Sequence, residues 1–246
     1  MTPSVMNDPP APADVRLTYG DHPSQFVDFR RSRIPGVRPL VVMIHGGFWR
    51  NRRDLTYAGH LCIALAQDGY ATANIEYRRV GDEGGGWPGT FDDVKRAIEF
   101  SRESAASFDA DPARTIVLGH SAGGHLALWV AAEIADLAGA IGLSAVANLR
   151  RCRELNLSNG AVLELMGGTP DEYPERYSAA DPATRPTAVK RVLIHGVNDD
   201  IVPVEMSRDY PLPARIVQLP GADHFAVIDP SSAAWPEVIS EIRALS

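Results

Sequence analysis

Cysteine is scarce in this chain: of its 246 residues only Cys62 and Cys152 are cysteines. No CxxC pair occurs, which excludes a zinc ribbon and a thioredoxin-like motif. We expect two buried free thiols rather than a disulfide, because unpaired cysteine is usually a small buried residue and cytoplasmic thiols stay reduced.

Long apolar runs are also missing. No stretch reaches the roughly 20 apolar residues that span a bilayer, and residues 1–14 have neither the basic start nor the apolar centre of a secretory signal. The sequence therefore predicts no membrane association and a cytoplasmic location. Residues 1–14 are rich in proline and polar side chains, so we expect a flexible leader followed by a single domain over 15–246.

A surplus of positive charge is absent as well, since 24 basic and 31 acidic residues give a net charge of −7. A protein that binds nucleic acid or acidic membranes would need a basic face, so neither partner is expected. Apolar residues make up 45% and charged residues 22%, close to the average for soluble globular proteins. The length fits one large α/β domain.

What the chain does contain is a regular alternation of short apolar runs and amphipathic stretches. Such alternation is typical of a mostly parallel sheet with helices on both faces. Strands are expected at Val15–Tyr19, Phe26–Phe29, Leu40–Ile44, Ala71–Ile75, Thr115–Leu118, Ala140–Leu143, Arg191–Ile194 and Ala214–Gln218, and helices at Tyr57–Gln67, Phe91–Ala105, Ala122–Ile134 and Ser232–Leu245. The stretch between Leu143 and Arg191 exceeds a plain crossover, so we expect a small cap insertion over about residues 147–186.

The strongest motif is Gly119-His120-Ser121-Ala122-Gly123, which fits G-x-S-x-G. It follows the apolar run TIVLG and opens a helical pattern, the strand–turn–helix context in which this motif exposes a nucleophilic serine. The glycines relieve crowding in the sharp turn, and the helix N-terminus favours developing negative charge. Ser121 is therefore the candidate nucleophile.

A serine hydroxyl needs a base, and hydrolases with this motif place an acid next in the chain and a histidine last. His224, after the strand ending in Gln218, is the candidate base. Asp199 is the preferred acid, with Asp200 as a rival that the sequence does not separate from it. We expect His195 to brace the acid loop, and His125 to pack behind the serine turn.

A third element, His45-Gly46-Gly47-Phe48-Trp49, directly follows the strand that ends at Ile44. A Gly-Gly turn lets backbone N–H groups approach a reacting oxyanion, because no Cβ stands in the way. The expected donors are the N–H groups of Gly47, Phe48 and Ala122, and we expect His45 to hold this loop by hydrogen bonds.

The set HGGFW, EYR, GHSAGGH, HGVNDDIVP and GADHF resembles the α/β-hydrolase superfamily, in its serine-hydrolase type. Within it, HGG followed by two aromatic residues is similar to the esterase and arylformamidase branch, related to hormone-sensitive-lipase-like carboxylesterases. The resemblance covers about residues 15–246. It implies the same triad (Ser121, His224 and Asp199) and the same three oxyanion donors.

These features predict a serine hydrolase that cleaves carboxylic esters of small or aromatic substrates through an acyl-enzyme, with no cofactor or metal. The main alternative is an arylformamidase that acts on an N-formyl aromatic amine. An aminopeptidase-like hydrolase and a non-catalytic binding module are further alternatives. The expected partner is a small ester or amide, and a homodimer formed through exposed strand edges is one state open to such a sheet.

Side chains near these motifs are candidates for the substrate pocket. Trp49, after the oxyanion loop, is expected either to line it or to lie at the edge of the core, and Ser144, after a strand, is a further candidate for its wall. Three arginines (Arg50, Arg52 and Arg53) either attract an anionic substrate group or form a solvated turn balanced by Asp54. In the glycine-rich stretch that follows Tyr77, we expect Arg78 to pair with Asp92 or Asp93.

Overall fold

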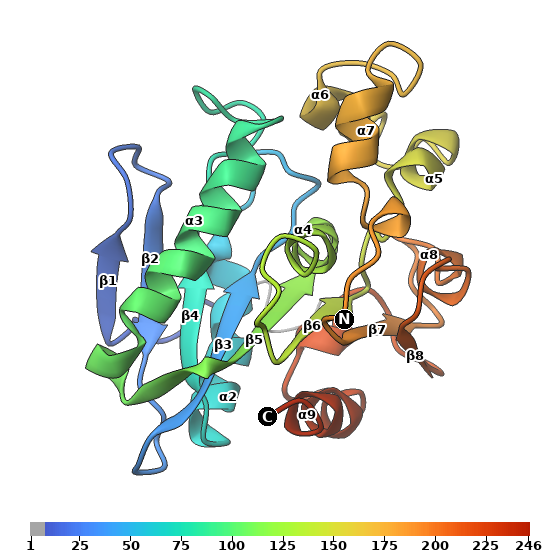
Figure 1. The fold of residues 1–246 in the computed structure, drawn as a ribbon. Helices are drawn as coiled ribbons and strands as arrows, with labels where there is room; N and C mark the ends of the chain where they lie inside the picture. Colours follow the sequence, from blue (N-terminus) through green and yellow to red (C-terminus); the bar gives the residue numbers. More distant parts are fainter. Residues whose placement is uncertain (1–7) are drawn as a thin grey trace.

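The computed structural model describes residues 8–246, and its centre is one eight-stranded sheet in the order β1-β2-β4-β3-β5-β6-β7-β8 (Figure 1). The β1–β2 and β2–β4 pairs are antiparallel, and the other neighbours pair in parallel. The predicted sheet of about eight mostly parallel strands is confirmed. The strands are β1 (Val15–Thr18), β2 (Phe26–Arg30), β3 (Arg38–Ile44), β4 (Ala71–Ile75), β5 (Ala110–His120), β6 (Gly139–Leu143), β7 (Arg191–Gly196) and β8 (Arg215–Leu219).

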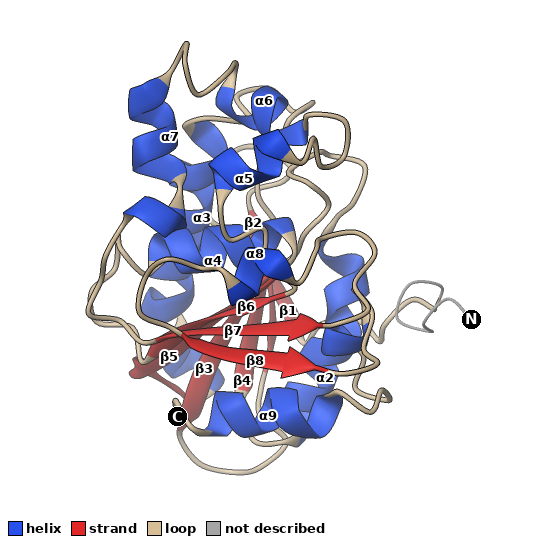
Figure 2. Cartoon of the chain, turned by 90° about the vertical axis from the view of Figure 1, so that its right-hand side faces the viewer, coloured by secondary structure: helices blue, strands red, loops and turns tan. Residues whose placement is uncertain are grey.

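Helices cover both faces of the sheet, as predicted (Figure 2). One face carries α2 (Gly59–Gln67) and α9 (Trp235–Arg243), and the other carries α3 (Gly89–Glu103), α4 (Ala122–Val130) and α8 (Glu205–Arg208). Short 3-10 turns complete the domain at Leu55–Ala58, Ala105–Phe108, Pro182–Thr184 and Ala226–Ile228.

The central strands read as continuous apolar runs because they are buried on both sides. In β3, Leu40, Val42 and Ile44 belong to the core under α3 and α4, whereas Val41 and Met43 belong to the core under α2 and α9. Alternate side chains of one strand therefore supply two separate cores, as the two-residue period of a strand requires.

The residues between β6 and β7 fold into α5 (Leu149–Glu154), α6 (Ala161–Met166) and α7 (Pro174–Ala180). Figure 2 shows them stacked beyond α4 and α8, away from the sheet. The α4 helix holds this insertion, since Trp129 Nε1 donates to Ala179 O at 3.0 Å and His125 Nε2 contacts Ala180 O at 3.0 Å.

The start of the described chain is bound to the domain. The Arg30 guanidinium donates to the carbonyls of Ala11 and Pro12 at 2.5 and 2.6 Å, and the Asp14 carboxylate accepts from Arg31 N at 2.8 Å. The flexible leader predicted over 1–14 does not extend to residues 11–14, because Arg30 at the end of β2 and Arg31 directly after it supply donors for their polar groups. Residues 1–7 lie outside the described part.

Two further expectations concern cysteine and membranes. Cys62 and Cys152 are both buried and free, as expected. Within residues 8–246, no helix combines the length and the apolar character needed to cross a bilayer.

Candidate active site

Ser121 occupies a strained turn between β5 and α4. Its φ of 57° and ψ of −119° lie in a region that residues other than glycine rarely adopt. A Cβ on Gly119 would collide with the Gly123 carbonyl, and one on Gly123 would collide with the Ile44 carbonyl. The two glycines therefore permit the close packing of strand, turn and helix that the motif predicted.

His224 and an acid from the preceding loop form a buried pair. His224 Nδ1 lies 2.7 Å from Asp199 Oδ2, and the Asp199 side chain is fully buried. Asp200 is exposed and lies outside this pair. Because Nδ1 faces a carboxylate, it carries the hydrogen, which leaves Nε2 as the basic nitrogen of the neutral ring.

The Asp199 carboxylate is held from several sides. The N–H groups of Ile201 and Val202 donate to Oδ1 at 2.9 and 2.8 Å. His195 Nε2 lies 3.2 Å from Oδ2, and its Nδ1 lies 2.7 Å from Ser207 Oγ, so His195 braces the acid loop as expected. Burial acts to raise the pKa of Asp199, but hydrogen bonds from His195 and His224 outweigh it and hold the pKa well below its usual value.

A cavity of about 250 Å³ brings Ser121 and His224 together. Its walls come from the loop after β3, the serine turn and the loops after β7 and β8. One residue of the insertion, Ser158, reaches it. The lining residues are Gly47, Phe48, Arg50, Arg52, Arg53, Tyr57, His120, Ser121, Ser158, Ile201, His224 and Phe225.

Two of the three predicted oxyanion donors line this cavity, and the third directly follows Ser121. Gly47 and Phe48 line it, with φ of 110° and 50°, and Ala122 is the first residue of α4. Within residues 8–246, the N–H groups of these three residues donate to no protein acceptor. They are thus free to bind a negatively charged oxygen.

Trp49 and Ser144 do not line the cavity, so the prediction that placed them there is wrong. With φ of 57°, Trp49 turns into the core, where it is fully buried and its Nε1 donates to His125 Nδ1 at 3.2 Å. Burial lowers the pKa of His125 to about 4, consistent with the expected packing role. Ser144 is also fully buried, where its N donates to Ile194 O at 2.8 Å.

Sequence reasoning gave no role to Tyr57 and His120, which link three loops of the site. Gly46 N donates to the Tyr57 hydroxyl, which lies 3.1 Å from His120 Nδ1, and His120 Nε2 lies 2.9 Å from His224 O. Burial lowers the pKa of His120 to about 3, so its ring is neutral and Nε2 donates to the His224 carbonyl. The apolar pattern of the sequence predicted Tyr57 only as the first residue of a helix.

The arginines near the site differ in their partners. Arg50 pairs with Glu164 of α6, at 2.6 Å between Nη2 and Oε1 and 2.7 Å between Nε and Oε2. Arg78 pairs with Asp93 rather than Asp92, at 2.7 Å. Arg52 and Arg53 are exposed, and within residues 8–246 their guanidinium groups form no ion pair.

Several known proteins that resemble this chain are named as esterases. Residues 31–136 match the family model described as BD-FAE. Esterase LipC of Mycobacterium tuberculosis is 29% identical over 248 residues, which cover 87% of this chain and 60% of LipC. The solved structure of esterase B from Lactobacillus rhamnosis has a TM-score of 0.78 at 20% identity, covering 98% of this chain and 91% of that one. The structure of a truncated carbohydrate esterase from gut microbiota has a TM-score of 0.77 at 17% sequence identity. This match covers 97% of this chain and 99% of that one.

Proposed function

We propose that this chain is an α/β-hydrolase of the serine-hydrolase type, as its motifs indicated, and that it cleaves carboxylic esters of small or aromatic substrates. The observation that carries the proposal is the buried Asp199–His224 pair at 2.7 Å, whose histidine lines the same cavity as Ser121. The chain spans 60% of LipC, whose name describes an esterase.

In the proposed mechanism, His224 Nε2 takes the proton from the Ser121 hydroxyl as the oxygen attacks the ester carbonyl. The N–H groups of Gly47, Phe48 and Ala122 stabilise the oxyanion. His224 then protonates the leaving alcohol, while Asp199 holds the ring and stabilises its positive charge. Water repeats the sequence on the acyl-enzyme and releases the acid.

The cavity supports a small substrate. At about 250 Å³ it is below the roughly 300–1,000 Å³ of typical ligand pockets. Phe48, Ile201 and Phe225 give it apolar walls suited to a short acyl chain or an aromatic ring.

A fluorophosphonate probe and two substrates test this proposal. We expect the probe to label Ser121, and kcat/KM to be higher for phenyl acetate than for N-formylkynurenine. A preference for the formamide would favour the arylformamidase alternative, and turnover of aminoacyl anilides alone would favour the aminopeptidase-like one. Failure to label Ser121 would favour a binding module.

The free arginines favour substrates with a carboxylate. Arg52 and Arg53 line the cavity, and none of its lining residues is acidic. Guanidinium groups bind carboxylates by paired hydrogen bonds. This arrangement supports acidic esters as preferred substrates. It supports the arylformamidase alternative equally, because the amino-acid substrate of that reaction also carries a carboxylate.

Replacing Arg52 and Arg53 together with glutamine should reduce this preference. We expect the ratio of kcat/KM for 4-acetoxybenzoate to that for 4-acetoxybenzamide to fall about 2- to 5-fold, the range of an exposed charge pair. The matched control is Arg243→Gln on α9, which changes one charge outside the residues that line the cavity. An unchanged ratio in the double variant would show that the two arginines are simply solvated.

A further inference from the structure

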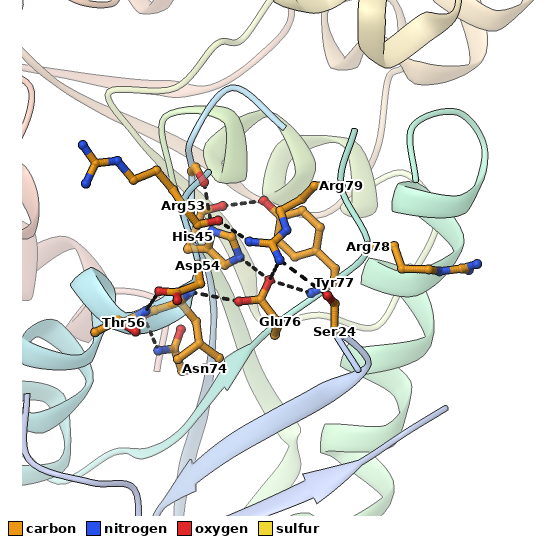
Figure 3. Close-up of polar contacts among 12 residues, drawn as sticks. Ser24, His45, Arg53, Asp54, Thr56, Asn74, Glu76, Tyr77, Arg78 and Arg79 are labelled. Carbon is orange, nitrogen blue, oxygen red and sulfur yellow. Dashed lines mark hydrogen bonds and ion pairs between the residues drawn. The ribbon is translucent and has the colours of Figure 1, made fainter. Parts of the chain in front are cut away.

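A buried polar network lies beneath the oxyanion loop, and Glu76 is at its centre (Figure 3). Glu76 follows β4 and is 2% exposed. Its Oε1 lies 2.9 Å from His45 Nε2, and its Oε2 accepts from Leu55 N at 3.0 Å. One carboxylate therefore ties both ends of loop 45–55.

Arg79 strengthens this anchorage. Its Nη2 lies 3.2 Å from Glu76 Oε1, and its Nη1 donates to the Arg53 carbonyl. Figure 3 shows the Arg53 guanidinium extending away from the network while its backbone is held within it. The loop that borders the cavity thus rests on two side chains from the segment after β4.

The partners of His45 determine the hydrogens on its ring. Nδ1 lies 2.8 Å from Gly46 O, and Nε2 lies 2.9 Å from the Glu76 carboxylate. A carbonyl and a carboxylate only accept hydrogen bonds, so both contacts are hydrogen bonds when each ring nitrogen carries a hydrogen, which is the positively charged form of the ring. His45 is fully buried and stacks on Tyr77 at 4.6 Å between ring centres.

The oxygen that His45 Nδ1 contacts belongs to the same amide group as an N–H that faces the cavity. Gly46 C=O and Gly47 N–H are parts of one peptide group, and the Gly47 N–H is a free donor in residues 8–246. A hydrogen bond from an imidazolium to the carbonyl oxygen withdraws electrons from the amide and makes its N–H a stronger donor. The Gly46 N–H, bound to the Tyr57 hydroxyl, fixes the preceding peptide.

We propose that His45, kept protonated by Glu76, is a positioning residue that orients and polarises the Gly46–Gly47 amide toward the reaction oxyanion. The inference rests on the proposed esterase function. It gives the His and Glu of the HGG and EYR motifs one shared role. The effect is confined to the transition state, because the ground-state ester carbonyl carries far less charge than the oxyanion.

Glu76→Gln is the test, because it removes the charge that holds the His45 proton while keeping nearly the same side-chain shape. We expect kcat to fall about 10-fold or more, with KM within about twofold, as for a weakened oxyanion donor. The Ki of a phenyl trifluoromethyl ketone, which forms an oxyanion on the serine, should rise by a factor similar to the fall in kcat. The Ki of acetophenone should not change.

Asp93→Asn is the matched control, because it breaks the ion pair that another buried carboxylate, that of Asp93, forms with the partly exposed Arg78 at 2.7 Å. It should lower the melting temperature with little change in kcat. If Glu76→Gln also lowers the melting temperature but leaves kcat and the Ki of the trifluoromethyl ketone at their wild-type values, Glu76 is only structural and the proposal is overturned.

The ¹⁵N shifts of the His45 ring provide a second test on the wild-type chain, independent of whether the variant folds. We expect both nitrogens to be protonated at pH 7, and one bare nitrogen would overturn the proposal. This readout does not depend on turnover. Absence of both ester hydrolysis and Ser121 labelling would instead count against the proposed function itself.

Discussion

Replacing Ser121 with alanine should lower kcat for phenyl acetate at least about 10³-fold and leave a folded protein. The proposed reaction needs an oxygen nucleophile at this turn, and alanine removes only that atom. Residual activity would come from the oxyanion donors and from substrate binding. Initial rates, together with a thermal melt to verify folding, make the measurement.

Ser144→Ala is the matched control for this variant. Ser144 is fully buried outside the cavity, and its Oγ has no hydrogen-bond partner in the described chain. We expect its kcat to stay close to that of the wild-type protein. Near-normal activity in Ser121→Ala would contradict the assignment of Ser121 as nucleophile.

Asp199→Asn should lower kcat by about 10³-fold or more, whereas Asp200→Asn should leave it nearly unchanged. An amide at position 199 presents a donor or a weaker acceptor to His224 Nδ1, so the ring loses the tautomer that leaves Nε2 free to act as base. Asp200 is exposed and has no part in the pair. Equal losses in the two variants would show that the loop, rather than one carboxylate, is required.

The same substitution has a pH signature in stability. The pKa of Asp199 is held well below its usual value in the folded chain. A group whose pKa is lowered by folding contributes stability above its unfolded pKa of about 3.9, and this contribution is lost as the pH falls below it. The difference in unfolding free energy between wild type and Asp199→Asn should therefore narrow as the pH falls toward 3. A constant difference would mean that the effect is steric.

Much of the fold followed from local patterns. Apolar runs such as Leu40–Ile44 are buried on both faces, and their alternation with helical stretches gives the parallel sheet. The order of Ser121, Asp199 and His224 along the chain identified residues that the structure brings to one site. Asp199 and Asp200 could not be separated, because adjacent residues of one loop differ only in the direction of their side chains.

The errors arose where position along the chain was taken for position in space. Trp49 directly follows the oxyanion loop, but its backbone turns the indole into the core beside His125. The contact between His45 and Glu76 could not be predicted from the sequence for a related reason. His45 and Glu76 are 31 residues apart and directly follow two neighbouring strands, and no local spacing shows which side chains meet just beyond the ends of β3 and β4.

The ion pair between Arg50 and Glu164 limits how this scaffold can be re-engineered. It fastens the loop after β3 to helix α6, and Arg50 Nη1 also donates to Ser158 O and Oγ at 3.0 and 2.9 Å. A graft that exchanges the segment between β6 and β7 would leave the Arg50 cation without its partner beside the cavity that Ser121 lines. A transplanted segment must therefore bring its own acceptor for Arg50.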